Sequence, residues 1–113
     1  MGKVKLALAT NGSKGLGDEI AGAFALAKTF TLATVDGNKV HLEVLKNPAE
    51  TLSHGRGRMV VQMLKEKGVD IVVAGEFGPG ASALLEQGRI RKVVVRTGTM
   101  VGDIIRERLY KKG

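Results

Sequence analysis

The residue with the clearest potential for chemistry is His54, which lies in the stretch Ser53–Gly57 (SHGRG). Apolar residues at helical spacing follow this stretch, so we expect a helix that begins there and continues to about Lys67. Gly55 and Gly57 let backbone N–H groups approach an anion, and the helix dipole favours negative charge at the same end. A neutral imidazole also ligates metals, so His54 is our candidate metal ligand. The alternative interpretation is a capped helix start with an exposed histidine.

A second glycine-rich stretch follows a predicted buried strand. Residues 69–81 read VDIVVAGEFGPGA, and the β-branched run that opens them is typical of a strand buried on both faces. In open α/β sheets ligands bind beyond the carboxyl ends of the strands. We therefore predict ligand contacts at Phe77, Gly78 and Gly80. The alternative is a tight strand-to-helix turn in which Phe77 packs in the core.

A third stretch, Thr10–Gly17 (TNGSKGLG), also follows a predicted strand, and we assign Asn11 and Gly12 as ligand contacts at the same edge. Its pattern resembles the glycine-rich turn of short-chain dehydrogenases. However, the acidic residue expected further along is Asp36, which falls in a predicted hairpin turn, and no Tyr-x-x-x-Lys pair follows. An enzyme that uses a nucleotide at this turn is therefore our last-ranked hypothesis.

The composition excludes several classes of chemistry. Cysteine is absent, which removes disulfides, thiol catalysis, thiolate zinc sites and cysteine-ligated iron–sulfur clusters. The only other histidine, His41, lies alone within a predicted strand and is interpreted as a surface residue. The carboxylates are scattered and do not form the cluster that a metal-dependent nuclease needs, so we predict no catalysis. Few thermolabile residues and many charged ones suggest a thermophilic protein.

The net charge of +7 is unevenly distributed along the chain. Residues 87–113 contain eight basic and two acidic side chains, which account for +6 of it. Nucleic-acid binding through this basic segment is our second hypothesis, and such binding would weaken steeply with salt. Tyr110 is the one aromatic residue there that could stack on a base. Asp103 and Glu107 alternate with the cations, as on a solvated helix face, so we rank nucleic acid below a small anionic ligand.

Strands and helices alternate along most of the chain, which favours a layered α/β fold. Two alternating runs flank Asp36-Gly37-Asn38, a strong hairpin signal, so one strand is expected to be antiparallel. We expect strands 4–10, 69–75 and 91–96 to form a parallel core, with the hairpin on one side. The remaining predictions are strands 29–35 and 39–45, a short helix over 18–27, a helix over 81–87, and a final helix with Val101, Ile104, Ile105 and Leu109 on one face.

The length of 113 residues suits a single domain over residues 1–113. No apolar run approaches the roughly 20 residues that span a bilayer, and the first ten residues lack the features of a signal peptide. We therefore expect a cytoplasmic protein that does not engage a membrane.

Taken together, the motifs resemble those of the dinitrogenase iron–molybdenum cofactor biosynthesis family. The resemblance covers nearly the whole chain and rests on the following stretches: LALATNG (6–12), GLGDEIAGAFALAKTFTLATVDG (15–37), SHGRG (53–57) and GVDIVVAGEFGPGASALLEQGRI (68–90).

The resemblance implies a ribonuclease H-like, three-layer α/β/α sandwich with a mixed five-stranded sheet that has one antiparallel strand. It also implies a non-catalytic carrier that holds an iron–sulfur or iron–molybdenum cluster, or a precursor, as cargo, with a protein partner for cofactor delivery. Family members often carry a His-Phe-Gly-like triplet where this sequence has Ala23-Phe24-Ala25. His54 is thus the one histidine that matches a family motif.

Overall fold

A five-stranded mixed sheet forms the centre of the computed structural model, which describes residues 2–107. The strand order is β3-β2-β1-β4-β5. Strand β2 runs antiparallel to β1 and β3, whereas β4 and β5 run parallel to β1. The strands are β1 (Val4–Thr10), β2 (Thr29–Asp36), β3 (Lys39–Lys46), β4 (Ile71–Ala74) and β5 (Arg91–Val94), and the α-helices are α1 (Arg56–Glu66), α2 (Pro79–Gln87) and α3 (Val101–Glu107).

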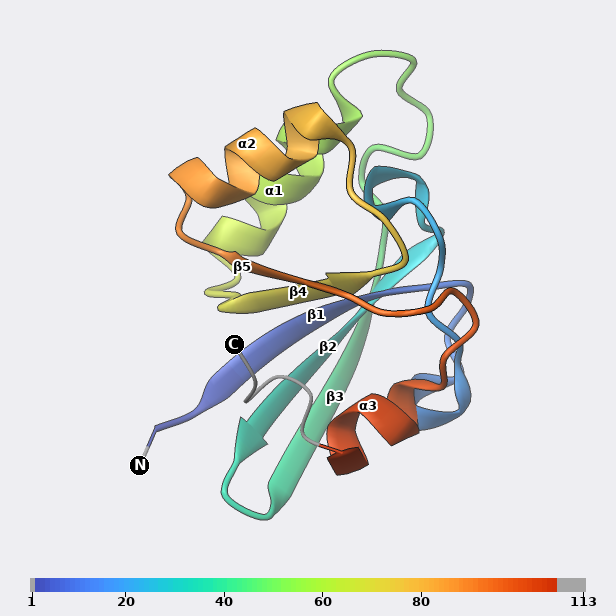
Figure 1. Ribbon diagram of the computed structural model, residues 1–113, viewed down its shortest axis with the longest axis vertical. Helices are drawn as coiled ribbons and strands as arrows, with labels where there is room; N and C mark the ends of the chain where they lie inside the picture. Colours follow the sequence, from blue (N-terminus) through green and yellow to red (C-terminus); the bar gives the residue numbers. More distant parts are fainter. Residues whose placement is uncertain (1, 108–113) are drawn as a thin grey trace.

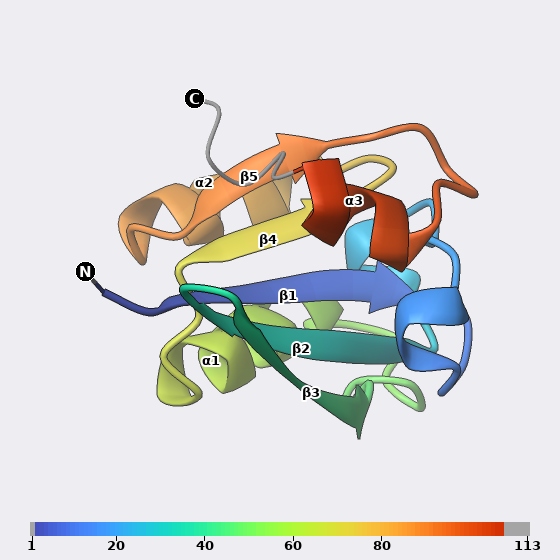
Figure 2. The same cartoon turned by 90° about the horizontal axis from the view of Figure 1, so that it is seen from below.

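The helices cover both faces of the sheet. Helices α1 and α2 lie side by side on one face, and α3 lies on the other (Figures 1 and 2). The loops that follow β1, β4 and β5 all leave the sheet at its carboxyl edge, as parallel strands require. The expected α/β sandwich with a parallel core of three strands and a hairpin on one side is confirmed.

The hairpin forms as the sequence predicted. Asp36 pairs with Lys39 across a two-residue turn, and the ladder continues to Thr29 opposite Lys46. Gly37 adopts a φ of +63°, which suits the first position of such a turn. This register places Ala33, Val35 and Leu42 on the α3 side of the sheet. These alternating apolar residues of the hairpin therefore pack in the cluster under α3.

Two apolar clusters fill the layers. The cluster under α1 and α2 contains the largest buried side chains, among them Phe24, Phe30 and Leu64. The cluster under α3 is smaller and is built around Leu6, Leu8 and Ile104. Strand β4 is buried along its whole length, as predicted for a strand covered on both faces.

The ends of several elements differ from the sequence prediction. The predicted strands 69–75 and 91–96 are shorter, as Ile71–Ala74 and Arg91–Val94, and α2 begins earlier, at Pro79. A proline is well suited to the first helical turn, because its missing N–H has no acceptor there in any case. The final helix places Val101 and Ile104 in the core as expected, whereas Leu109 and Tyr110 lie outside the described residues.

The predicted helix over 18–27 is wrong. The segment instead runs across the carboxyl ends of β1 and β4: the Ala21 N–H donates to the Ala9 carbonyl at 2.8 Å, and the N–H groups of Gly75 and Glu76 donate to the carbonyls of Ala21 (3.0 Å) and Gly22 (2.9 Å). Only one turn of 3₁₀ helix, η2 (Phe24–Leu26), follows. These tertiary hydrogen bonds use the backbone groups that a helix would need, and Gly22 is a poor helix former.

The crossing of this segment over β4 requires a glycine at position 75. A Cβ at Gly75 would lie 2.2 Å from the Thr97 Oγ1, 3.0 Å from the Gly22 Cα and 3.1 Å from the Gly22 carbonyl oxygen. Two of these neighbours are backbone atoms that cannot rotate away, so the segments would have to separate.

We predict that Gly75→Ala lowers the free energy of unfolding by about 2–3 kcal/mol, because the added methyl group overpacks a backbone crossing. Gly80→Ala is the matched control: a Cβ there meets nothing within 4 Å, and alanine favours the helix. Chemical denaturation of both variants measures the difference. Equal midpoints for Gly75→Ala and wild type would contradict the close approach.

Candidate functional site at the helix N-termini

The N-termini of α1 and α2 lie against each other at the carboxyl edge of the sheet. A Cβ added at Gly57 would be 3.7 Å from the Ala81 Cβ and 4.0 Å from the Ala81 backbone nitrogen. The two motifs SHGRG and FGPG, which are separated by about twenty residues of sequence, are therefore neighbours in space. The small residues at the contact allow the two backbones to approach this closely.

Both helix starts present backbone donors. The first helical hydrogen bonds run from Met59 N–H to the Gly55 carbonyl (3.1 Å) and from Ser82 N–H to the Gly78 carbonyl (2.9 Å). The N–H groups of residues 56–58 and 80–81 precede these bonds and have no acceptor within their own helix. Together with the two helix dipoles, they make this edge favourable for negative charge.

Gly55 sets the start of α1. It adopts a φ of +75° at the N-cap position, a left-handed conformation that favours glycine. The next residue, Arg56, turns back toward the preceding loop, where its Nε donates to the Leu52 carbonyl at 2.5 Å and its Nη2 to the Glu50 carbonyl at 3.4 Å. Arg56 thus holds the loop in place, whereas the Arg58 side chain is exposed.

His54 is exposed and lines a hollow of about 620 Å³ between α1 and the loop that precedes it. The apolar walls of this hollow are Pro48, Leu52, Met59 and Met63, and Arg58 also lines it. Within residues 2–107, no group of three or more His, Cys, Asp or Glu side chains could hold a metal ion. His54 is therefore a single donor beside a hollow and does not belong to a protein-built metal cage.

Phe77 anchors the loop after β4 to the core. Its ring lies 5.2 Å from that of Phe24, centroid to centroid, and is partly buried. The Lys92 Nζ lies 5.9 Å from the centroid of the same ring, within the range of a cation–π interaction. Gly78 and Gly80, on either side of Pro79, are exposed and leave space above the backbone. The sequence pattern did not indicate that Lys92 belongs to this edge.

Asn11 and Gly12 line a different hollow from the one beside His54. The Gly12 carbonyl accepts a hydrogen bond from the Thr29 Oγ1 at 2.6 Å, and both residues line a hollow of about 170 Å³ beside the buried carboxylate of Asp18. That carboxylate accepts from the backbone N–H groups of Lys14 (3.2 Å) and Glu19 (2.8 Å). The predicted contacts thus divide into two groups: residues 54–57 with 77–80, and residues 11–12.

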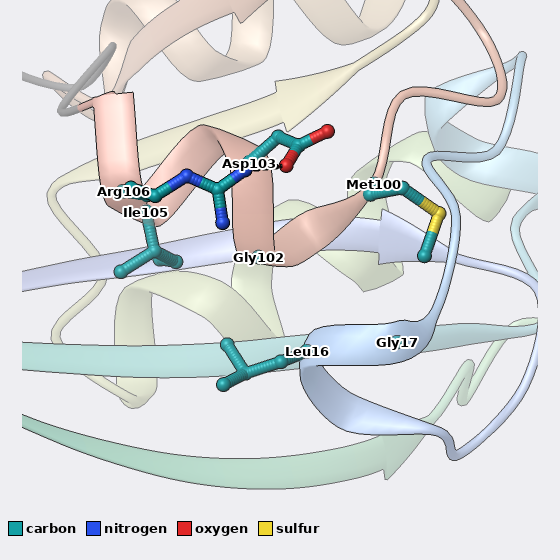
Figure 3. A pocket seen from close by; sticks show the side chains of 7 residues that line it. All are labelled: Leu16, Gly17, Met100, Gly102, Asp103, Ile105 and Arg106. Carbon is teal, nitrogen blue, oxygen red and sulfur yellow. Dashed lines mark hydrogen bonds and ion pairs between the residues drawn. The ribbon is translucent and has the colours of Figure 1, made fainter.

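The loop that carries Asn11 and Gly12 continues into η1 (Gly15–Gly17), which packs under α3. Leu16 and Ile105 reach from η1 and α3 into a hollow of about 560 Å³ that Met100 also lines (Figure 3). Arg106 and Asp103, at its rim, form an ion pair with each other. This hollow lies beside α3, on the opposite face of the sheet from α1 and α2 and away from their N-termini (Figure 2), so we do not place the site here.

Asn47 is a positioning residue that the sequence reasoning missed. Its side chain is buried, and its Nδ2 donates to the carbonyls of Ala25 (3.0 Å) and Ala27 (2.8 Å), while its Oδ1 accepts from the Ala49 N–H at 2.8 Å. These bonds fasten the start of the loop that carries His54 to the segment beside Phe24. In the sequence, the pair Asn47-Pro48 indicated the start of a connecting loop and no anchoring role.

The mixed five-stranded sheet, with helices on both of its faces (Figure 2), defines a small α/β sandwich. The chain belongs to the dinitrogenase iron–molybdenum cofactor family, whose model matches residues 3–111. It is similar to the apo form of the orange protein from Desulfovibrio gigas, with 28% identity, a TM-score of 0.82, and coverage of 94% of this chain and 87% of that one. It is also similar to a putative NifB protein from Thermotoga, with 27% identity, a TM-score of 0.75, and coverage of 96% and 89%. Among curated proteins, none matches this chain.

The helices of residues 2–107 include none with the length and apolar character needed to cross a membrane.

We predict that Asn47→Ala lowers the free energy of unfolding by about 2–4 kcal/mol, because it leaves buried backbone groups without partners. Asn47→Asp is expected to be at least as damaging, since one carboxylate oxygen would face the carbonyls of Ala25 and Ala27. Asn11→Ala, at an exposed position, serves as the control and should change stability by no more than about 0.5 kcal/mol. Thermal and chemical unfolding of the three variants test this, and a wild-type midpoint for Asn47→Ala would contradict the anchoring role.

Proposed function

We propose that this chain is a non-catalytic carrier, a single cytoplasmic domain over residues 1–113. Its cargo is an anionic ligand, namely an iron–sulfur or iron–molybdenum type cluster or its precursor. The observation that carries the proposal is the contact of Gly57 with Ala81, because it joins two helix N-termini at one place. One helix N-terminus attracts a single anionic group, whereas two adjacent ones suit a larger anion.

In this proposal the protein binds the cargo mainly through its backbone. The N–H groups at the two helix starts donate hydrogen bonds to sulfide or other anionic atoms of the cargo. Glycines at positions 55, 57, 78 and 80 place no side chain in the way of this approach. His54 supplies the one imidazole within reach of a metal. Because cysteine is absent, the cluster must bring its own sulfur ligands, which suits a cargo that is later released.

Two cations lie near this arrangement. Arg58 is exposed and lines the same hollow as His54, and Lys92 lies over Phe77. Their charge adds to the field of the helix dipoles and favours a multiply charged anion over a neutral ligand. Asn11 and Gly12, in their separate hollow, would contact only cargo large enough to extend beyond the segment 18–23.

The comparisons support a carrier or binding role in preference to catalysis. The family model covers residues 3–111, and the orange protein is similar over most of both chains. The finer fold assignment is also a proposal: the strand order with β2 alone antiparallel supports a ribonuclease H-like sandwich. The delivery of a cargo implies a protein partner that supplies or receives it.

We predict that His54→Ala weakens cluster binding about tenfold without changing the melting temperature, because the imidazole is exposed and its loss leaves the core intact. The control is His41→Ala, an exposed histidine on β3, which should change neither quantity. The measurement is an anaerobic titration of apo protein with isolated iron–molybdenum cofactor and with a synthetic thiolate-ligated iron–sulfur cluster.

Equal binding by wild type and His54→Ala would assign the binding to the backbone alone. If the wild-type protein binds neither cluster, the carrier proposal fails.

A further inference from the structure

Within residues 2–107, strand β5 pairs with β4 on one side and has no strand paired with its other edge. It is the last strand of the sheet within the described residues, on the side that α2 borders (Figures 1 and 2). The N–H groups of Arg91 and Val95 donate to the carbonyls of Asp70 (3.0 Å) and Ala74 (3.1 Å). Because backbone groups alternate in direction along a strand, those of Lys92 and Val94 point away from β4.

A hollow runs beside this edge. It has a volume of about 430 Å³ and lies between α2 and β5. The Val94 side chain, on the same side of the strand as Lys92, is 65% exposed. Alternate side chains of a strand added to β5 would point toward α2. The hollow is lined by Pro79, Ser82, Ala83, Glu86, Ile90 and Lys92.

The charge around this edge is mainly positive. Of the described residues, four exposed cations lie on or next to β5, and Glu86 is the one acidic residue that lines the hollow. A partner segment that carries carboxylates would be attracted, and a basic one would be repelled. The cations are Arg89, Arg91, Lys92 and Arg96; Arg91 already has an interaction within the protein, so the attraction is assigned to the other three.

We propose that the β5 edge and its neighbouring hollow form the docking site for an extended acidic segment of a partner protein, which adds a strand to the sheet. Backbone hydrogen bonds to Lys92 and Val94 supply the pairing, and the hollow selects alternate side chains, as in other complexes formed by strand addition. This inference goes beyond the carrier function and does not depend on it, because docking requires no cargo.

The same edge fits a peptide better than a nucleic acid. Single-stranded nucleic acids bind through cations together with aromatic rings on which bases stack. Among residues 2–107, the aromatic ring nearest to this edge is Phe77, which already contacts the Phe24 ring and Lys92. A peptide in the β conformation can interact with both features of this edge. Its main chain can form hydrogen bonds with the outward backbone groups of Lys92 and Val94, and an apolar side chain can pack on the exposed Val94.

The probe for the test is a capped, fluorescently labelled peptide of about eight residues that alternates Glu and Val, roughly the length of a strand. Three variants of the peptide serve as controls. One is N-methylated on the backbone nitrogens of its odd positions, one on those of its even positions, and the third has Lys in place of each Glu. Fluorescence anisotropy with the full apo chain measures the affinities.

We expect one N-methylated copy to bind at least tenfold more weakly than the parent peptide and the other to bind like it, because only one set of N–H groups faces β5. The Lys copy should not bind. Equal binding by both N-methylated copies would show that charge alone attracts the peptide and would overturn the proposal, as would no binding up to about 1 mM.

Val94→Pro and Val94→Thr form the matched pair on the protein. Proline removes the outward N–H, fixes φ and is tolerated at edge strands, whereas threonine keeps both the N–H and the branched shape. We expect at least a tenfold loss for Val94→Pro and less than about a twofold change for Val94→Thr.

Tighter binding of a single-stranded oligonucleotide than of the acidic peptide would reassign the edge to nucleic acid. If Val94→Pro does not fold, the N-methylated peptides decide the question. Because all measurements use apo protein, their failure leaves the carrier proposal untouched, and failure of cluster binding leaves this one untouched.

Discussion

The arrangement of this protein depends on a short run of backbone hydrogen bonds at the carboxyl edge of its sheet. Residues 18–23 cross that edge, and Ala21 bonds to the end of β1 through the Ala9 carbonyl while its own carbonyl accepts from Gly75. The neighbouring Ile20 exchanges hydrogen bonds with Thr99 and Gly98, in the loop after β5. One extended segment therefore fixes the loops of three parallel strands. A helix over these residues would satisfy the same backbone groups internally and leave the loops unattached.

The crossing segment also divides the edge chemically. The loop after β1 passes to the α3 side, where its carbonyl and N–H groups bond to Thr29 and Asp18. The loops that begin α1 and α2 lie on the other side, where their N–H groups have no helical acceptor. The side with unused donors suits an anion. The side whose backbone is already hydrogen-bonded contributes mainly to stability.

Much of the fold followed from local signals, and the rest required tertiary contacts. The two-residue turn at Gly37 and the alternation in β2 and β3 predicted the hairpin, and the apolar run of β4 predicted its burial. Helix propensity failed over 18–27 because it does not report hydrogen bonds to distant strands. The strand order was enough to bring Gly57 toward Ala81. It did not separate Asn11 from His54, because loops that leave the same edge can turn to opposite faces. No sequence motif marked Asn47 or Lys92. Each acts through a contact with a segment that is distant in sequence, Asn47 with the carbonyls of Ala25 and Ala27 and Lys92 with the Phe77 ring.

The charge of β5 has a further consequence for how an open sheet edge is kept soluble. Edge strands are commonly protected by being short and charged, and β5 has both properties. If β5 of a second copy paired with it, the exposed cations Arg89, Lys92 and Arg96 of both chains would be brought to one ladder, and their mutual repulsion would oppose the pairing. The same cations attract a strand rich in carboxylates. One set of side chains thus disfavours self-association and favours an acidic partner. The edge at β3 carries Lys39, Glu43 and Lys46, which include both signs, and so has no comparable preference.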